Sequence, residues 1–365
     1  MTAAKPVRIL LLGTGAMAER HTHFFGEIDD CRIVAAVDIS EPRLKAFCAQ
    51  HKIPEYFIDL DEAIAWGGFD AVSNITPDAV HHPTVMRLVE VGKPILCEKP
   101  LAPSYPLALE MTEAVERRGI VNMVNLRYRG LSVMQMARAL VEDGMIGEVR
   151  HIDAAYLQSW LVGTHWGDWR TEERWLWRLS GAHGSRGVLG DIGIHILDFA
   201  CYVSDQSPVS VHCRLKAFGK AEGDRIGAYA LDANDSFVMS IEFDGGALGV
   251  IHASRWMTGY ANAQKLAVFG THGAIEIWFE SEKMGMRICA GEDVHTQTWR
   301  EVECPPVPNT YRNFVDAVRS GENLEPSFRH AAELQHVLDL AFESDRLGKA
   351  LPVNPPAEPK KEAIG

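Results

Sequence analysis

Three segments of the chain carry residues whose types and spacing suit chemistry on a small molecule. The first is Gly13-Thr14-Gly15-Ala16-Met17-Ala18, a GxGxxA pattern at the end of an apolar run over residues 7–13. In such a loop the first glycine permits a tight turn, the second lets a pyrophosphate approach the backbone, and the small third residue lets helix and strand pack closely. The following helix would present N–H groups to the phosphates. The pattern predicts a dinucleotide site that includes Gly13, Thr14, Gly15, Ala16 and Met17.

An acidic residue follows this loop at the distance that a dinucleotide site requires. Asp38 ends the second apolar run, 20 residues after Ala18. Its carboxylate is placed to bond the ribose hydroxyls of an adenosine, and it would repel a 2′-phosphate. NADP sites usually have a small residue at this position, followed by an arginine. Arg43 is instead expected in the next helix, so the sequence favours NAD over NADP. A glycine-rich turn with a strand-terminal aspartate is the purely structural alternative.

The second segment is Cys97-Glu98-Lys99-Pro100-Leu101, at the end of the fifth apolar run. In a doubly wound sheet the carboxyl ends of the strands face the ligand crevice, so Lys99 could reach a bound nicotinamide and its substrate. A buried lysine beside a carboxylate can hydrogen-bond a reacting oxygen and stabilise negative charge on it. Taken alone, a Lys-Pro pair fits a solvated loop equally well.

The third segment is the nonapeptide GDIGIHILD at residues 190–198. At the start of a helix, Asp191 and His195 would share a face, and Asp198 could orient the His195 imidazole. Histidine can accept a hydroxyl proton near neutral pH, and a carboxylate can fix its tautomer. Asp191 as a helix cap with His195 in the core is one alternative, and a metal site of all three residues is another. The sequence holds no second ligand cluster, so no metal is expected.

The elements that position these segments can be read from hydrophobic patterning. Nearly continuous apolar runs occur at 7–13, 32–38, 70–76, 93–98 and 120–125, as in strands buried on both faces of a parallel sheet. Helices are expected between them at 41–51, 78–91 and 104–118, the first with Pro42 just inside its start. This alternation predicts an α/β fold whose N-terminal domain, residues 1–127, is a doubly wound parallel sheet of the Rossmann type.

From residue 128 the pattern changes to a few helices and mostly strands. Helices are expected at 131–144, 191–203, 309–320 and 327–347, and strands at 148–158, 236–244 and 247–256, the last two as a hairpin. The strands predict a C-terminal α/β domain, residues 128–351, with a large open, mainly antiparallel sheet. The proline-rich, charged residues 352–365 are expected to form a flexible tail or an arm on a partner subunit.

The composition argues against several classes of partner. Among 365 residues, 36 Lys and Arg face 49 Asp and Glu, a formal net charge of −13, which disfavours nucleic acid or an anionic membrane. No apolar run approaches the ~18 residues of a membrane span, and the N-terminus has no signal-peptide layout. Seven widely spaced cysteines without a CxxC pair disfavour disulfides. We therefore expect a cytoplasmic protein that handles a small molecule.

Together these segments resemble the Gfo/Idh/MocA family (glucose-fructose oxidoreductase, inositol dehydrogenase and rhizopine-catabolism proteins) over residues 7 to about 350. The resemblance rests on GTGAMA, TPDAVHHP (76–83), CEKPLA (97–102), NLRYR (125–129), GDIGIHILD and YRNFVDAVRSG (311–321). It implies that Lys99, Asp191 and His195 are catalytic and that the Lys99–Pro100 peptide is cis. The further residues that it implies for the cofactor are Thr76, Pro77, His81 and Glu98, and those for the substrate are Arg127 and Tyr128.

A tryptophan-rich segment is the most individual feature of the chain. Five of the nine tryptophans fall within residues 160–177, at Trp160, Trp166, Trp169, Trp175 and Trp177. Indoles can stack on the C–H faces of sugar rings, which makes Trp169 and the adjacent Arg170 candidate substrate contacts. A hydrophobic cluster or a subunit contact explains the segment equally well.

The resemblance implies an NAD-dependent dehydrogenase that oxidises a secondary hydroxyl of a sugar, sugar derivative or inositol. His195 would take the hydroxyl proton, Lys99 would hydrogen-bond the same oxygen, and Asp191 would position substrate and His195, while NAD carries the hydride. An NAD-dependent glycosidase acting by transient sugar oxidation and a non-catalytic ligand-sensing protein are the alternatives. The resemblance also implies a homodimer or homotetramer assembled through the C-terminal sheet.

Overall fold

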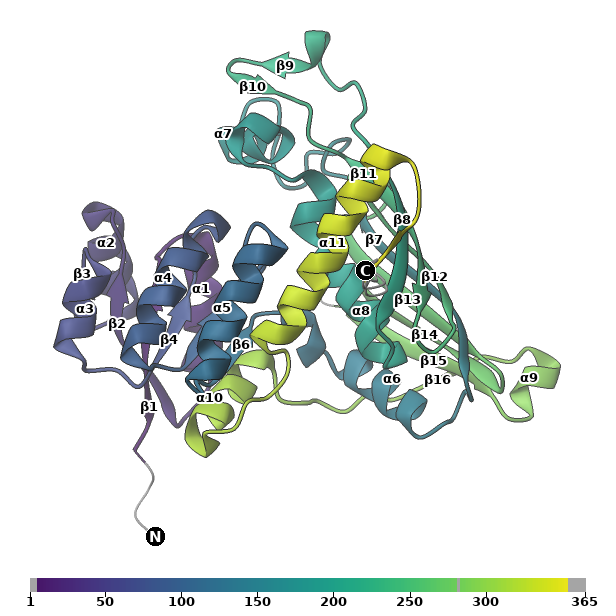
Figure 1. The fold of residues 1–365 in the computed structure, drawn as a ribbon, viewed down its shortest axis with the longest axis horizontal. Coiled ribbons are helices and arrows are strands. Elements are labelled where there is room, and N and C mark those ends of the chain that lie inside the picture. Colours follow the sequence, from purple (N-terminus) through teal and green to yellow (C-terminus); the bar gives the residue numbers. More distant parts are fainter. Residues whose placement is uncertain (1–4, 281–282, 354–365) are drawn as a thin grey trace, which may run out of the picture. The chain divides into compact units, whose positions relative to one another are not determined.

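The computed structural model describes residues 5–280 and 283–353, and the chain divides into two compact units. Unit 1 comprises the described residues of Met1–Gln135 and Pro305–His336, and unit 2 those of Met136–Cys304 and Val337–Gly365. The segment 305–336, expected from the sequence in the C-terminal domain, therefore packs with the N-terminal one. Figure 1 shows the elements of both units, which are described separately below.

Unit 1 is built on a six-stranded parallel sheet with the order β3-β2-β1-β4-β5-β6. The strands are β1 (Val7–Leu12), β2 (Cys31–Val37), β3 (Glu55–Phe57), β4 (Ala71–Asn74), β5 (Ile95–Cys97) and β6 (Asn122–Val124). The strand order reverses at β1 and β4, which confirms the doubly wound sheet. Strand β3 was not predicted, because this short strand lies at the sheet edge and is too exposed to show an apolar run.

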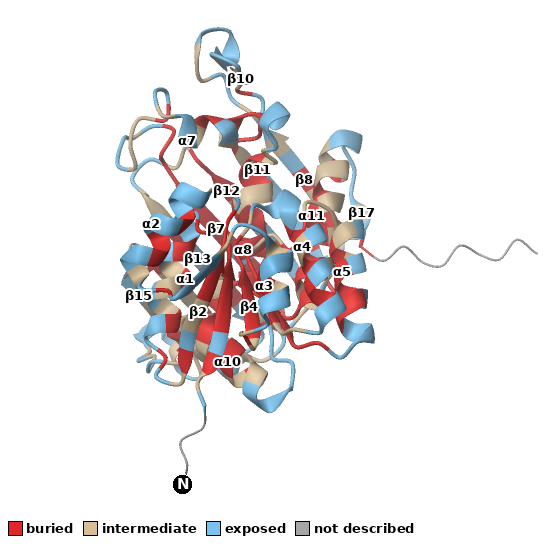
Figure 2. Ribbon diagram, turned by 90° about the vertical axis from the view of Figure 1, so that its left-hand side faces the viewer, coloured by how far each residue is buried: buried red, intermediate tan, exposed pale blue. Residues whose placement is uncertain are grey.

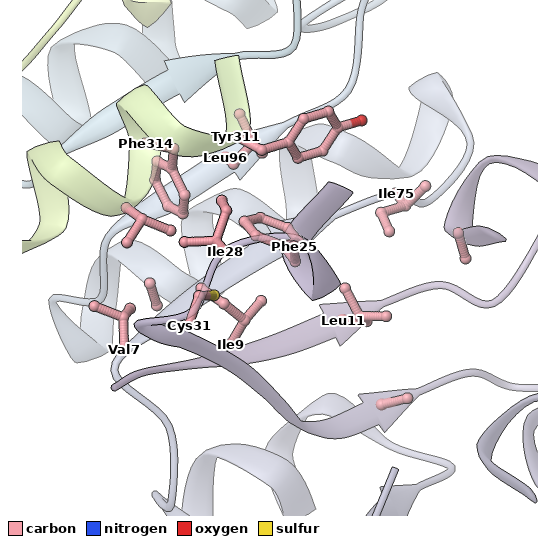
Figure 3. Close-up of a cluster of buried hydrophobic side chains, with 14 of the residues drawn as sticks. Val7, Ile9, Leu11, Phe25, Ile28, Cys31, Ile75, Leu96, Tyr311 and Phe314 are labelled. Atoms are coloured by element: carbon pink, nitrogen blue, oxygen red, sulfur yellow. The ribbon is translucent and has the colours of Figure 1, made fainter. Parts of the chain in front are cut away.

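The helices of unit 1 follow the strands in alternation. They are α1 (Ala16–Gly26), α2 (Glu41–His51), α3 (Leu60–Trp66), α4 (Asp78–Val91), α5 (Tyr105–Arg117) and α10 (Thr310–Ser320), with the 3-10 turn η1 (Arg127–Gly130). Helix α10 belongs here because Tyr311 and Phe314 join Ile9 of β1 and Phe25 of α1 in one buried cluster, shown in Figure 3. Helices α6 (Ser132–Glu142) and α11 (Phe328–Leu347) each begin in unit 1 and end in unit 2.

Unit 2 is built on a nine-stranded sheet with the order β16-β15-β14-β13-β7-β12-β11-β8-β17. The strands are β7 (Val149–Gln158), β8 (Pro208–Lys216), β11 (Ser236–Phe243), β12 (Leu248–Ser254), β13 (Asn262–Gly270), β14 (Gly273–Glu280), β15 (Lys283–Ala290), β16 (Arg300–Glu301) and β17 (Leu351–Pro352). Among these pairs β7 and β12 run parallel and the others antiparallel, which confirms the open, mainly antiparallel sheet and the β11–β12 hairpin.

The remaining elements of unit 2 are short, apart from one buried helix. They are α7 (Glu173–Leu176), α8 (Ile194–Ser204), α9 (Asp293–Thr296), β9 (Arg225–Ile226), β10 (Tyr229–Ala230), the 3-10 turns η2 (Trp177–Leu179), η3 (Gly181–His183) and η5 (Glu222–Asp224), and the π turn η4 (Leu189–Gly193). Helix α8 packs on β7, β12 and β13, and Figure 2 shows it almost wholly buried. The expected tail begins later than residue 352, since Pro352 pairs with β8, and residues 354–365 lie outside the described residues.

Two faces of the unit 2 sheet differ in character. On β11, Phe237, Met239 and Ile241 are buried, whereas Val238 and Ser240 between them are exposed. The exposed face also carries apolar side chains on neighbouring strands, namely Leu248, Val250 and Phe269.

Among the helices of residues 5–280 and 283–353, none has the length and apolar character that a membrane span needs.

Candidate active site

The loop between β1 and α1 has the geometry that a bound pyrophosphate requires. Gly13 has a φ of +102°, and a Cβ there would lie 2.9 Å from the Ile75 carbonyl oxygen, so both conformation and space demand glycine. A Cβ on Gly15 would meet no described atom within 4 Å. Gly15 also caps α1 without a side-chain hydrogen bond, which leaves the helix N-terminus suited to an anion. The loop therefore fits a dinucleotide.

Asp38 lies directly beside this loop and is held by four groups. Its Oδ2 accepts hydrogen bonds from the Thr14 N–H and hydroxyl, both at 2.8 Å, and its Oδ1 accepts from the Ser40 N–H at 2.8 Å. Arg43 of α2 reaches back and donates to both oxygens, at 2.7 and 3.2 Å. Burial alone would raise the pKa of Asp38, but these hydrogen bonds lower it below its usual value. The carboxylate is thus ionised with a cation beside it.

Glu98, just before Lys99, is the centre of a buried polar cluster. Its Oε1 lies 2.9 Å from His21 Nε2 and accepts a hydrogen bond from Asn125 Nδ2 at 2.6 Å. Burial alone would raise the pKa of Glu98, but the hydrogen bond and charge of His21, the Asn125 amide and the charge of Lys99 lower it to about 2. Glu98 Oε2 in turn accepts a hydrogen bond from the Lys99 N–H at 3.1 Å. A buried carboxylate therefore holds the backbone of Lys99.

The other side of this cluster is anchored by three neighbouring elements. His21 Nδ1 lies 2.8 Å from Ser73 Oγ on β4, and His21 itself is fully buried on α1. The Asn125 amide also donates to the Tyr311 hydroxyl of α10 at 2.9 Å. Burial, and secondarily the charge of Glu98, raise the pKa of Tyr311. Hydrogen-bonded chains of this kind rigidify the group at their end, which here is the Lys99 segment.

His81 fixes the other flank of the Lys99 segment. Its ring is 1% exposed, with Nδ1 2.9 Å from the Pro100 carbonyl oxygen and Nε2 2.8 Å from the Thr76 carbonyl oxygen. The Thr76 hydroxyl donates to Asn74 at 2.7 Å, and Pro77 caps α4. The Lys99–Pro100 peptide is cis, as expected. The structure thus brings the predicted residues Thr76, His81 and Glu98 together around Lys99.

Two further predicted residues of unit 1, Arg127 and Tyr128, contact each other. Arg127 Nη2 donates to the Tyr128 hydroxyl at 2.7 Å, and its guanidinium lies 4.1 Å from the centroid of the Tyr128 ring. Tyr128 is 3% exposed. The pair lies in η1, directly after β6.

In unit 2, Asp191 occupies a π turn rather than the regular helix start that we expected. The turn η4 covers Leu189–Gly193, and α8 begins at Ile194, so the spacing of Asp191 and His195 is not that of one α-helical face. Such turns are frequent at functional sites. Asp191 Oδ2 accepts a hydrogen bond from Arg255 Nη2 at 3.1 Å. Arg255 was not predicted as a site residue from the sequence.

His195 and Asp198 lie in the first turns of α8 and are both buried. They are 6% and 2% exposed, and the His195 ring lies 6.5 Å from the Tyr156 ring of β7, centroid to centroid. Burying a polar side chain costs free energy unless the side chain has a hydrogen-bond partner. Within the described residues, no group of three or more His, Cys, Asp or Glu side chains is placed to hold a metal ion.

The tryptophan-rich segment forms a hydrophobic cluster. Trp160 and Trp169 are 3% and 1% exposed and pack with Leu161, Leu176 and Leu179. The Trp169 indole N–H donates to the Leu161 carbonyl at 3.2 Å. This burial favours the packing interpretation for Trp169 over ring stacking on a substrate, because a fully buried indole offers no face to a ligand.

Some tryptophan and arginine side chains of the same segment remain accessible. Arg170 lies 4.6 Å over the Trp169 ring and pairs with Asp168 at 3.5 Å. Trp177 is 41% exposed, with Arg178 4.5 Å over its ring. Arg170, but not Trp169, therefore stays a candidate for contact with a substrate.

Two family models match the chain. The model described as "Oxidoreductase family, NAD-binding Rossmann fold" matches residues 7–126, and the model of the GFO/IDH/MocA C-terminal domain matches residues 134–276. The chain belongs to the Gfo/Idh/MocA oxidoreductase family. The family expectation is thereby confirmed.

Several relatives in the Gfo/Idh/MocA family are similar to most of the chain. Levoglucosan dehydrogenase of Pseudarthrobacter phenanthrenivorans is 26% identical over 74% of this chain and 76% of its own length. Inositol 2-dehydrogenase of Rhizobium meliloti is 25% identical over 93% of this chain and 96% of its own length. A crystal structure of an oxidoreductase domain protein from Kribbella flavida, 26% identical, superposes with a TM-score of 0.85, covering 96% of this chain and all of the other.

Proposed function

We propose that the protein is an NAD-dependent dehydrogenase that oxidises a secondary hydroxyl of a sugar, sugar derivative or inositol. The observation that carries the proposal is the Gly13–Gly15 loop, open at the start of α1, with the ionised Asp38 beside it. The substrate class is supported by the relatives, whose names describe dehydrogenases of levoglucosan and inositol. We place the protein in the cytoplasm, as its composition led us to expect.

Three side chains are proposed to act on the substrate hydroxyl. His195 accepts the hydroxyl proton, and Lys99, held through its backbone by Glu98, donates a hydrogen bond to the same oxygen. Asp191, held by Arg255, positions the substrate and the imidazole. Bound NAD would accept the hydride. In unit 1, Gly13, Thr14, Gly15, Ala16 and Met17 would hold the pyrophosphate, and Asp38 the ribose.

A screen of sugars, sugar acids and cyclitols with NAD or NADP, followed by NADH or NADPH absorbance at 340 nm, tests this function. We expect turnover with at least one polyol and NAD. Glycoside hydrolysis without accumulation of reduced cofactor would instead identify an NAD-dependent glycosidase. Tight sugar binding without either reaction would identify a ligand-sensing protein.

The Asp38–Arg43 pair leads to a sharp prediction of cofactor preference. The wild type should prefer NAD, because the Asp38 carboxylate bonds ribose hydroxyls and repels a 2′-phosphate. Asp38→Ser should raise kcat/KM for NADP, since it removes that repulsion and frees the Arg43 guanidinium, 53% exposed, to bind phosphate. Arg43→Ala in the Asp38→Ser background should abolish the gain. Steady-state kinetics with both cofactors measures these ratios.

A matched control for this prediction exists in the same unit. Asp70 also forms a two-oxygen hydrogen-bonded pair with an arginine, Arg8, at 2.8 and 3.0 Å. Asp70→Ser should leave the ratio of NAD to NADP activity unchanged. A wild type that works better with NADP than with NAD would contradict the assignment of Asp38.

We also propose that the exposed face of the unit 2 sheet pairs two or more copies of the chain. This face carries Val238 and Leu248, 56% and 46% exposed, on adjacent strands. An apolar sheet face is stable when covered, and closed homo-oligomers are the common solution. The double variant Val238→Lys/Leu248→Lys should therefore lower the mass in light scattering to that of one 40.5 kDa chain.

The control for assembly is Val91→Lys, at an exposed apolar position on α4 of unit 1. This variant should keep the mass of the wild type. A wild type that is monomeric at micromolar concentration would contradict pairing through the sheet, because interfaces of this kind are large and stable.

A further inference from the structure

Arg255 is a fully buried cation whose hydrogen bonds converge on the candidate active site of unit 2. It follows directly after β12 and is 0% exposed. Its Nη2 donates to Asp191 Oδ2 at 3.1 Å and its Nη1 to the Arg178 carbonyl at 3.1 Å. The guanidinium lies 4.9 Å over the Trp160 ring. These contacts leave a rigid, planar group with little room to move.

The surrounding charges make Asp191 the carboxylate that this guanidinium bonds. Asp235 also lies near, but its Oδ2 is 2.8 Å from the buried Lys220 Nζ. The Asp235 carbonyl accepts a hydrogen bond from the Arg255 N–H at 3.0 Å, so the two residues are joined through the backbone. Burial lowers the pKa of Arg255, opposed first by the charge of Asp191 and next by that of Asp235. Among the described residues, Arg255 Nε has no hydrogen-bond partner.

Asp191 and Arg255 differ in burial, which indicates that Arg255 holds Asp191 in place rather than the reverse. The Asp191 side chain is 34% exposed, whereas Arg255 is not exposed at all. Asp191 also lies in the π turn η4, and such turns are frequent at functional sites. A half-buried carboxylate in a turn is thus bonded to a fully buried cation.

We propose that Arg255 is a positioning residue that holds the Asp191 carboxylate in one orientation for the substrate. The inference rests on the proposed function, in which Asp191 orients the substrate and His195. Small displacements of a positioning group cost large factors in rate. Lysine would keep the charge but not the planar fork, so it should restore only part of the effect.

The test is a double-mutant cycle on the purified full-length protein with a substrate found in the screen. Arg255→Met should lower kcat/KM by about 10- to 100-fold, and Arg255→Lys should recover part of that loss. In an Asp191→Asn background, Arg255→Met should change kcat/KM by less than about threefold, because the two residues act as a unit. NADH binding, followed by its fluorescence, should stay as in the wild type for every variant.

Arg138→Met is the matched control for loss of a packed arginine in unit 2. Arg138 likewise donates to a backbone carbonyl, that of Tyr202 at 3.0 Å, and to a carboxylate, Asp205 at 2.8 Å, and lies 4.8 Å over an aromatic ring. The Arg138→Met variant should have a lower melting temperature than the wild type and an unchanged kcat/KM.

The possible outcomes separate the inference from the proposed function. Independent, multiplicative effects of Arg255→Met and Asp191→Asn, or an unchanged kcat/KM in Arg255→Met, would overturn the positioning role while leaving the dehydrogenase in place. A wild type that oxidises no compound in the screen would overturn the proposed function, and the inference with it.

Discussion

Replacing His195 by alanine is expected to lower turnover by about 100- to 10,000-fold, the usual contribution of a positioned acid–base group. The residue is 6% exposed on the buried helix α8, so its loss removes a fixed proton acceptor rather than a mobile surface group. NAD binding should remain nearly intact, because the phosphate loop and Asp38 belong to unit 1. Stopped-flow measurement of NADH formation, with NADH binding measured separately, distinguishes the two effects.

Lys99→Met should be at least as harmful as His195→Ala. It removes the charged donor to the oxygen on which negative charge develops, and such donors are worth large factors in rate. The Glu98 carboxylate would also lose a neighbouring cation that lowers its pKa. Methionine keeps most of the unbranched side chain and lacks the ammonium group, so the change tests mainly charge and hydrogen bonding rather than packing.

The pH dependence and a milder variant sharpen this test. The acidic limb of the rate profile reports deprotonation of the base, so it should flatten in His195→Ala. Asp198→Asn should reduce turnover less, since in our proposal it acts only through the orientation of the imidazole. Loss of activity with a chelator would instead indicate a metal site. Near wild-type turnover in His195→Ala on a confirmed substrate would show that the mechanism is wrong.

Local patterns predicted the parts of the fold that depend on neighbouring residues in the chain. The GxGxxA loop, Asp38 and the buried runs of the parallel strands all lie within short segments, and they fold as expected. The helix at 309–320 was predicted as well, but its place was not. Tyr311 packs on Phe25, almost three hundred residues away, and periodicity shows only that a helix has an apolar face and not which core it joins.

The residues that the sequence analysis missed act through long-range contacts. His21 meets Glu98 across 77 positions, and Arg255 meets Asp191 across 64. Neither could be found from its neighbours, because His21 lies on α1 among mostly polar, exposed residues and Arg255 follows β12, whose residues alternate between exposed and buried. The π turn at Asp191 likewise had no signal, since its sequence also fits a regular helix start.

His21→Leu should destabilise unit 1 by about 1–3 kcal/mol or more at pH 7, the cost of leaving a buried carboxylate without a hydrogen-bond partner. His21 is fully buried between Ser73 and Glu98, and its removal leaves the Glu98 carboxylate without that hydrogen bond. His23→Leu on the same helix is the matched control. The His23 and Glu27 side chains are 64% and 58% exposed, and surface pairs contribute little, so this variant should stay within about 1 kcal/mol of the wild type.

The effect of His21→Leu should also shrink as the pH falls. In the wild type the pKa of Glu98 is lowered to about 2, against about 4.3 in an unfolded chain. A lowered pKa stabilises the fold above the unfolded value, and this stabilisation is lost as the pH falls from about 5 toward about 2. Without His21 the pKa of Glu98 is higher, so the variant has less of this stabilisation to lose in acid. The difference in the free energy of unfolding between the variant and the wild type therefore narrows below pH 5. Urea unfolding at pH 7, 5 and 4 measures the gap. Equal stability of His21→Leu and His23→Leu, or a gap that widens in acid, would contradict an ionised Glu98 held by His21.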